Sequence, residues 1–312
     1  MKVKLTLVIS LFIVGFNHAQ SSGLQLLEVG PTAAELSLSE AAVATPNGSS
    51  SIYTNPALLV MQQRPSISLG YTNWIADSNN LFGGINLKNG NRAIAFSFYT
   101  SGISGFEQRN NPGDSNGDFS IQYVSISGAY SREFKWFSAG IAAHYLNEEV
   151  FPFRANGYAI NLGLATALSN DRIRIGTSLL NIGEMEKLDQ VATNLPSSFN
   201  FGVAVDVLEF VHEKSPELPI LATIMVDYVQ PIESFSSNEQ DFTPSETYFN
   251  LGLNLLITEI VEVRAGYKTQ DNARPTSFGL GFIAEKVTFR YALIPFNTGF
   301  GTVHSIGLQY QL

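Results

Sequence analysis

The side chains able to do chemistry are few and scattered along the chain. Cysteine is absent, and only four histidines occur. His144 and Glu148 lie an even number of residues apart, so on a strand both would point to the same side, where a polar contact is expected rather than catalysis. No two histidines have the spacing of a metal site, and no serine lies in a nucleophile elbow. The sequence therefore predicts no catalytic residue, no metal ligand and no cofactor, and so a protein that is not an enzyme.

One acidic stretch resembles the beginning of a calcium-binding loop. Its residues are Asp114, Ser115, Asn116, Gly117 and Asp118. In such a loop the glycine follows the third acidic position instead of preceding it, and a glutamate that binds the ion closes the loop. Both features are missing here. A solvated turn is the preferred interpretation, with a calcium site as the alternative.

The amino terminus has the pattern of a secretory signal peptide. Lys2 and Lys4 precede an apolar run from Leu5 to Phe16, and Ala19 provides a small residue before the expected cleavage. The run is too short to span a bilayer as a helix, which takes about 20 residues. We therefore expect residues 1–19 to be removed on export. A buried amino-terminal helix in a cytosolic protein is the alternative.

Composition narrows the class of the exported chain. The net charge is −9 and no basic cluster occurs, which argues against nucleic acid as a partner. Charged residues make up only 14%, while aromatic residues reach 12%. Yet no stretch after residue 20 is long and apolar enough to form a membrane helix. A closed β-barrel is the membrane structure that fits this combination, because it satisfies every backbone polar group without helices.

The alternation of residue types supports a barrel. From Pro65 onward, bulky apolar residues alternate with Gly, Ala, Ser, Asn and Gln, as at 66–72, 158–165, 198–207 and 305–312. Alternate residues of a strand face opposite sides of the sheet. Bulky residues facing lipid and small ones facing a lumen describe an outer-membrane barrel. A soluble sandwich or barrel, which would carry more charge on its solvent-facing side, is the alternative.

The pattern predicts about fourteen strands in residues 65–312. They are expected near 66–75, 80–87, 92–100, 119–130, 136–147, 155–168, 172–182, 197–208, 218–230, 246–257, 260–269, 276–283, 287–293 and 303–312. The connections alternate between short and long, which is typical of periplasmic turns and outer loops. An even number of strands places both ends of the barrel domain on the periplasmic side.

Residues 20–64 do not alternate and are expected to form a plug segment with a little helix inside the barrel. The inward residues are too small to fill a lumen of this width by themselves. Asn55 and Pro56 are expected to turn the chain from the lumen to the wall. A periplasmic tail is the alternative. His144, Glu148, Asn161 and Asn200 are the candidate polar contacts in the lumen.

Three stretches carry a resemblance to a known family. They are residues 27–58 with Asn55-Pro56-Ala57, residues 179–183 with Asn181 and Gly183, and a closing hairpin at 291–308 that includes Pro295, Gly299, Gly301 and His304. Together they resemble the PorV/PorQ family of outer-membrane proteins. That family is similar to the FadL-like fourteen-stranded barrels.

The resemblance implies an outer-membrane protein of a Gram-negative bacterium, in contact with membrane lipid, and two functions remain open. PorV/PorQ relatives serve type IX secretion, so the first function is protein export or surface attachment through secreted cargo and secretion components. FadL-like relatives move hydrophobic small molecules through the lumen. The first is the preferred prediction and the second is the alternative.

Overall fold

The architecture comes from a computed structural model that describes residues 24–107, 118–188, 191–192, 194–212, 215–232 and 246–312. The predicted signal peptide lies outside these residues, as does most of the calcium-like stretch; Asp118 begins a strand. In the described part of the chain, no helix is both long and apolar enough for a membrane span.

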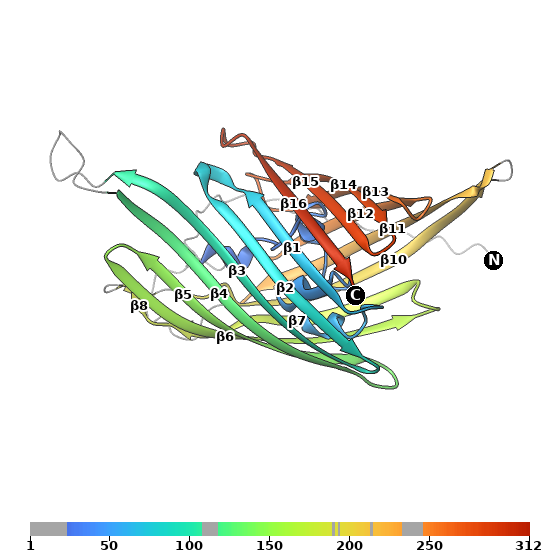
Figure 1. The fold of residues 1–312 in the computed structure, drawn as a ribbon, viewed down its shortest axis with the longest axis horizontal. Helices are drawn as coiled ribbons and strands as arrows, with labels where there is room; N and C mark the ends of the chain where they lie inside the picture. The colour runs from blue at the N-terminus through green and yellow to red at the C-terminus, as the bar shows by residue number, and fades with distance from the viewer. Residues whose placement is uncertain (1–23, 108–117, 189–190, 193, 213–214, 233–245) are drawn as a thin grey trace, which may run out of the picture.

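Fourteen antiparallel strands close into one barrel (Figure 1). They are β1 (Ser66–Asn73), β2 (Asn79–Asn89), β3 (Arg92–Glu107), β4 (Asp118–Glu133), β5 (Ser138–Val150), β6 (Phe153–Leu168), β7 (Ile173–Met185), β10 (Ser198–His212), β11 (Ser215–Pro231), β12 (Tyr248–Ile257), β13 (Val261–Lys268), β14 (Thr276–Ala284), β15 (Val287–Pro295) and β16 (Thr302–Gln311). β1 pairs with β16, with Ser66 opposite Gln311. A small hairpin, β8 (Lys187–Leu188) and β9 (Val191–Ala192), lies outside the barrel sheet. The predicted fold class is confirmed.

Each predicted strand corresponds to one observed strand, but two hairpins are longer than expected. β3 continues to Glu107 and pairs with β4 through residues that had been assigned to a loop. β10 and β11 likewise extend into the predicted turn at 209–217. These extensions lie toward the ends of their hairpins. The alternation of apolar and polar residues ends before the backbone pairing does, so the sequence pattern predicts shorter strands in these two hairpins.

The two faces of the wall have the predicted composition. On β16, Val303, Ser305 and Gly307 are buried, whereas Ile306 and Leu308 are exposed on the outside. The same alternation of bulky exposed and small buried residues recurs around the barrel. An apolar exterior on a closed sheet is the surface that lipid requires.

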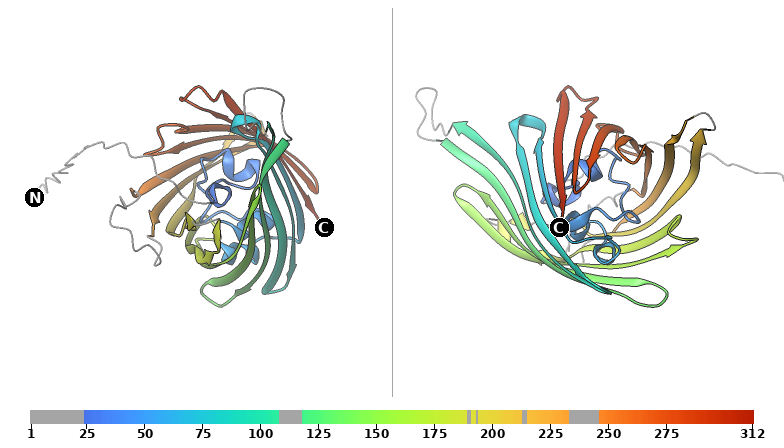
Figure 2. Two further views of the ribbon diagram at one scale, coloured as in Figure 1. Left: turned by 90° about the vertical axis from the view of Figure 1, so that its left-hand side faces the viewer. Right: turned by 45° about the vertical axis from the view of Figure 1, so that its right-hand side comes forward.

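The amino-terminal residues 24–64, here called the plug segment, lie inside the barrel (Figure 2). They contain η1 (Gln25–Glu28), α1 (Ala33–Leu36), η2 (Gly48–Ile52) and η3 (Pro56–Leu59). The first described residue, Leu24, packs against Leu146 and Ala159 in the half of the wall nearer the long loops. The segment then descends to join β1 at the end with the short turns, which is the end expected to face the periplasm.

Candidate functional site

The inner wall is shaped to fit the plug segment. Many inward-facing positions are glycines whose missing side chain is replaced by plug atoms; a Cβ at Gly70 would meet Pro31, and one at Gly84 would meet Ser49. The same holds around the wall at Gly140, Gly163, Gly176, Gly202, Gly266 and Gly279. Because packed interiors leave no room for even one extra methyl group, these glycines form a seat for the segment.

Asn55 and Pro56 lie deep in the lumen rather than at the wall. Asn55 is fully buried, its Nδ2 donates to the carbonyl oxygens of Val43 (2.9 Å) and Leu164 (3.1 Å), and its Oδ1 accepts from the backbone N–H of Ala57. The pair thus caps η3 and ties the plug segment to β6. The chain joins the wall only at Ser66, so the predicted turn from lumen to wall does not fall at these two residues.

Asn161 and Asn200 both face the lumen and are buried, as their positions in the alternation predicted. Asn161 donates through Nδ2 to the carbonyl oxygen of Ile52 in the plug segment (3.0 Å). Its Oδ1 accepts from the N–H of Asn181 (2.7 Å), at a bulge where Asn181 has a positive φ of 58°. Asn200 reaches Ser178 on the neighbouring strand through a long contact of 3.4 Å.

His144 belongs to a buried neutral network with Tyr53 of the plug segment. Its Nδ1 lies 2.7 Å from Ser127 Oγ, and that hydroxyl lies 2.9 Å from Tyr53 Oη. The Tyr53 and His144 rings are 5.1 Å apart, and Tyr53 also makes edge contacts with Phe82 and Tyr99.

Glu148 is buried in the wall on the same inward-facing side of β5 as His144. It interacts with Tyr123, so the two candidate polar residues of β5 have separate partners. Through Ser127, the His144 network holds Tyr53 of the plug segment in place.

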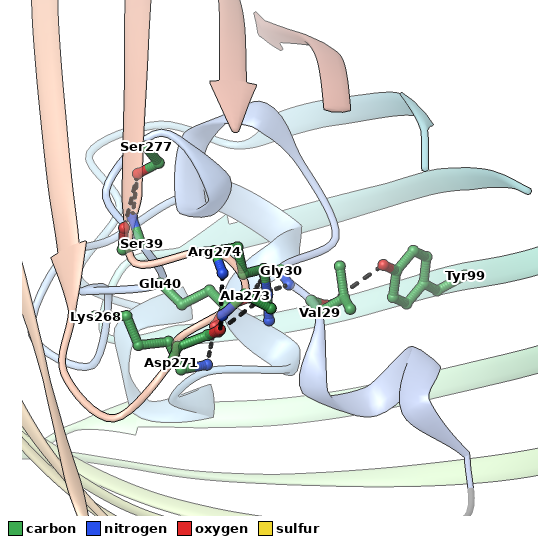
Figure 3. Close-up of polar contacts among 10 residues, drawn as sticks. All are labelled: Val29, Gly30, Ser39, Glu40, Tyr99, Lys268, Asp271, Ala273, Arg274 and Ser277. Carbon is green, nitrogen blue, oxygen red and sulfur yellow. Dashed lines mark hydrogen bonds and ion pairs between the residues drawn. The ribbon is translucent and has the colours of Figure 1, made fainter. Parts of the chain in front are cut away.

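On the opposite side, the plug segment is held by charge (Figure 3). Glu40 accepts from Lys268 Nζ (2.9 Å) at the end of β13 and from Arg274 Nη1 (3.0 Å) in the following loop. It also accepts from the backbone N–H of Gly30 (3.3 Å), and Arg274 pairs in addition with Asp271. We call Glu40, Lys268, Arg274 and Asp271 the ionic latch.

The electrostatics of the latch favour the charged carboxylate of Glu40. Burial by itself would raise the pKa of Glu40, but attraction to Arg274 and Lys268, together with their hydrogen bonds, lowers it from 4.5 to about 2. Aromatic rings also stabilise the two cations, because Lys268 lies over the Tyr248 ring and Arg274 over the Trp74 ring.

Further polar contacts reach the plug segment from the same side of the barrel. Arg264 Nη1 donates to the carbonyl oxygen of Ala34 (2.8 Å), and the N–H of Val43 donates to Asp227 Oδ2 (2.9 Å). None of these charged residues was predicted from the sequence to belong to a site. A signal was present in β13, where Glu262, Arg264 and Lys268 occupy inward positions that elsewhere carry small neutral residues.

An apolar cluster joins the long loops to the plug segment beside the latch. Trp74, Ile75 and Phe296 from the loops pack with Val29 and Leu36 of the plug segment and with Ile294 of β15. A small cavity next to it is lined by Leu36, Ile294 and the latch residues Glu40, Lys268 and Arg274. The apolar cluster and the ionic latch therefore lie next to each other.

The closing hairpin lies at the end of the barrel with the long loops. Pro295 ends β15, and Gly299 and Gly301 have positive φ values of 80° and 79° in the turn. His304 is exposed and its Nδ1 contacts Tyr291 Oη (2.5 Å), so it does not face the lumen. Within the described residues, no group of His, Asp and Glu side chains could hold a metal ion.

Comparison with known proteins defines the class through the fold. No family model matches the chain, and no curated protein matches it. Among solved structures it is similar to the toluene transporter TodX of Pseudomonas putida, with a TM-score of 0.51 and 11% identity over 88% of this chain and 98% of TodX. The Acinetobacter baumannii outer membrane protein Omp33 gives a TM-score of 0.44 at 8% identity, over 80% of this chain and 98% of Omp33.

The chain therefore has the fold of FadL-like fourteen-stranded outer-membrane barrels. The outer-membrane localisation predicted from the sequence agrees with this fold and with the apolar exterior. The narrower PorV/PorQ assignment has no sequence match behind it.

Proposed function

We propose that this barrel is a channel for small hydrophobic molecules, with the plug segment as its gate. The observation that carries the proposal is the apolar cluster of Trp74, Phe296, Leu36 and Ile294, which leads from the outer loops to the ionic latch. A hydrophobic solute would gain from leaving water at this cluster. The fold shared with the toluene transporter TodX supports the same class of substrate.

Binding at the cluster can be tested with the protein's own tryptophans. The chain contains two, Trp74 in the cluster and Trp136 in the β4–β5 turn. In a Trp136→Phe protein, titration with a monoaromatic hydrocarbon should change the Trp74 emission and reach saturation. The matched control is Trp74→Phe, which reports from Trp136 alone. A linear change of equal size in both proteins means that the hydrocarbon only dissolves in the detergent, and contradicts the proposal.

Transport is tested in cells whose outer membrane carries lipopolysaccharide. Expression of the barrel should speed the accumulation of a monoaromatic hydrocarbon and leave the rate for a polar solute of similar size unchanged. Equal acceleration of both solutes would indicate a nonspecific pore, and no acceleration of either would exclude the channel.

The export role implied by the PorV/PorQ resemblance rests on sequence motifs alone. Its test is purification of the barrel from its native outer membrane, followed by identification of bound proteins. A secreted protein retained in stoichiometric amount, together with no hydrocarbon uptake, would favour export over transport.

A further inference from the structure

Two arginines lie side by side on the outside of the wall. Arg92 begins β3 and is the direct register partner of Arg132 on β4. Both are exposed, and they share the outward-facing side with Ile94 and Tyr130, which are 46% and 41% exposed. Two positive charges therefore lie at neighbouring positions near one edge of the lipid-facing surface.

In the part of the chain that the structure describes, neither arginine forms an ion pair. Like charges directly opposite each other across two strands destabilise the pair. Among the described residues, no carboxylate lies within ion-pair distance of either guanidinium. The other outward neighbours in register are Asn89 beside Arg92 and Ala139 beside Arg132, and both are uncharged. The two guanidinium groups thus have no ion pair with the described residues, Glu133 beside Arg132 included, and are open to an external anion.

The adjoining β4–β5 turn is built for the interface between lipid and water. Its residues Phe134, Lys135, Trp136 and Phe137 are all exposed, Trp136 to 77%. Phe134 stacks on Phe137, and the Arg132 guanidinium lies over the Phe134 ring. Aromatic rings with a polar side collect at the level of lipid headgroups, and cations beside them meet phosphate there.

The turn lies at the end of the barrel with the short connections. The β2–β3 turn before Arg92 and the β4–β5 turn after Arg132 are both at the end where the chain joins the wall at Ser66 and where β16 finishes at Gln311. Short turns mark the periplasmic side of such barrels. The lipid leaflet next to the two arginines is therefore the periplasmic one, which consists of glycerophospholipids.

We propose that Arg92 and Arg132 form a binding site for the phosphate of an anionic glycerophospholipid of the periplasmic leaflet. The two guanidinium groups donate to the phosphate oxygens, and the acyl chains lie along the exposed Ile94 and Phe96. Trp136 lies at headgroup depth and completes the site. The site is independent of the lumen and of the proposed channel.

Native mass spectrometry of the full-length barrel, exchanged into detergent with defined lipids, tests the site. The probes are phosphatidylglycerol and phosphatidylethanolamine of identical acyl chains. We expect phosphatidylglycerol to be retained in preference. Arg92→Gln with Arg132→Gln should lower its affinity about 25-fold, because each basic residue near an anionic lipid surface contributes roughly fivefold.

The matched control is Lys286→Gln. Lys286 lies over an aromatic ring, that of Tyr310, at another short turn, but has no opposing arginine. It should leave the preference for phosphatidylglycerol unchanged. Unchanged affinity in the double variant, or an equal loss in the Lys286 control, would overturn the proposal. So would binding of lipid A that is as strong and as dependent on the two arginines, because lipid A belongs to the opposite leaflet.

Discussion

The two halves of the barrel hold the same plug segment by different chemistry. On the side of strands β1 to β7, Tyr53 of the plug segment packs against the buried rings of Phe82 and Tyr99 in the wall. Neutral amides add hydrogen bonds there, from Asn55 of the plug segment and from Asn161 of the wall. Strands β10 to β16 combine apolar packing with charged and polar contacts, in which Glu40, Arg264 and Asp227 take part. The two ion pairs of Glu40 come from Lys268 at the end of β13 and from Arg274 in the loop that follows it.

The difference suggests that the two sides of the plug segment have different roles in gating. Apolar and aromatic packing is insensitive to ions and holds one side of the segment in a fixed position. A charged contact can exchange partners, so the other side can be released by an anion, by acid or by a ligand that disturbs the latch. We therefore expect the plug segment to swing away from β13 and β14 while it stays attached to β3, β4 and β5.

The largest effect is expected on the aromatic side. Tyr53→Ala removes a buried ring that contacts Phe82, Tyr99 and His144, and loss of a large buried side chain destabilises by about 3–5 kcal/mol. Urea unfolding in lipid vesicles should report a loss of this size, with faster proteolysis of the plug segment.

Tyr53→Phe is the control for the aromatic side. It keeps the ring contacts and removes only the hydroxyl that reaches Ser125 and Ser127, so a loss of about 1 kcal/mol is expected. If the alanine and phenylalanine variants lose equal stability, the hydroxyl network and not the ring packing holds this side.

The latch should give the next effect. Glu40→Gln leaves Lys268 and Arg274 without their carboxylate, and hydrogen bonds to charged groups are worth about 1.5–3 kcal/mol. Single-channel recordings should show frequent brief openings, while proteolysis near Tyr53 stays slow. Arg154→Gln, which removes an exposed ion pair with Glu149, should leave the recordings unchanged. If Glu40→Gln opens no more often than the unaltered protein, charge does not hold the gate.

The glycine seat should give a smaller and more local effect. A methyl group at Gly163 would meet Asn55 and Pro56, and overpacking of this kind destabilises by about 1–3 kcal/mol. Gly163→Ala should therefore loosen the plug segment and raise its rate of hydrogen exchange. Gly128 has only ordinary contacts with Phe96 around its missing Cβ, so Gly128→Ala is the control and should exchange as the unaltered protein does. Equal exchange in both variants would mean that the wall glycines do not seat the segment.

The smallest effect is expected from acid. The folded pKa of Glu40 is about 2, below its ordinary 4.5, so the latch gives its full stabilisation above about pH 4.5 and loses it as the pH falls toward 2. Openings should become more frequent over this range. Glu40→Gln, which has no proton to gain, should lose the response, and an unchanged acid response in that variant would assign it to another group.

The barrel could be predicted from the sequence because its constraint is periodic. Phe199, Phe201 and Val203 alternate with small residues, and that period is sufficient to place a strand and orient its faces. The inward direction of His144, Glu148, Asn161 and Asn200 followed from the same rule.

The latch could not be predicted, because its members are distant in the chain. Glu40 and Lys268 are 228 positions apart, and no spacing rule relates a residue of an irregular segment to one on a strand. The inward charges Glu262, Arg264 and Lys268 on β13 did indicate that something polar lies opposite them. The partner became identifiable only when the path of the plug segment was known. Likewise, Asn55 and Pro56 were recognised as a turn, but the depth of that turn depends on the packing around it.

The measurement that tests the central claim most directly is the conductance of the barrel without its plug segment. Deletion of residues 23–50 removes the Glu40 contact and the segment next to the apolar cluster, and keeps β1 to β16. In planar bilayers we expect large, persistent pores in place of a closed barrel. A deletion variant that is folded, as shown by a heat-dependent shift in detergent gels, and yet has unchanged conductance would contradict the claim that the plug segment closes this lumen.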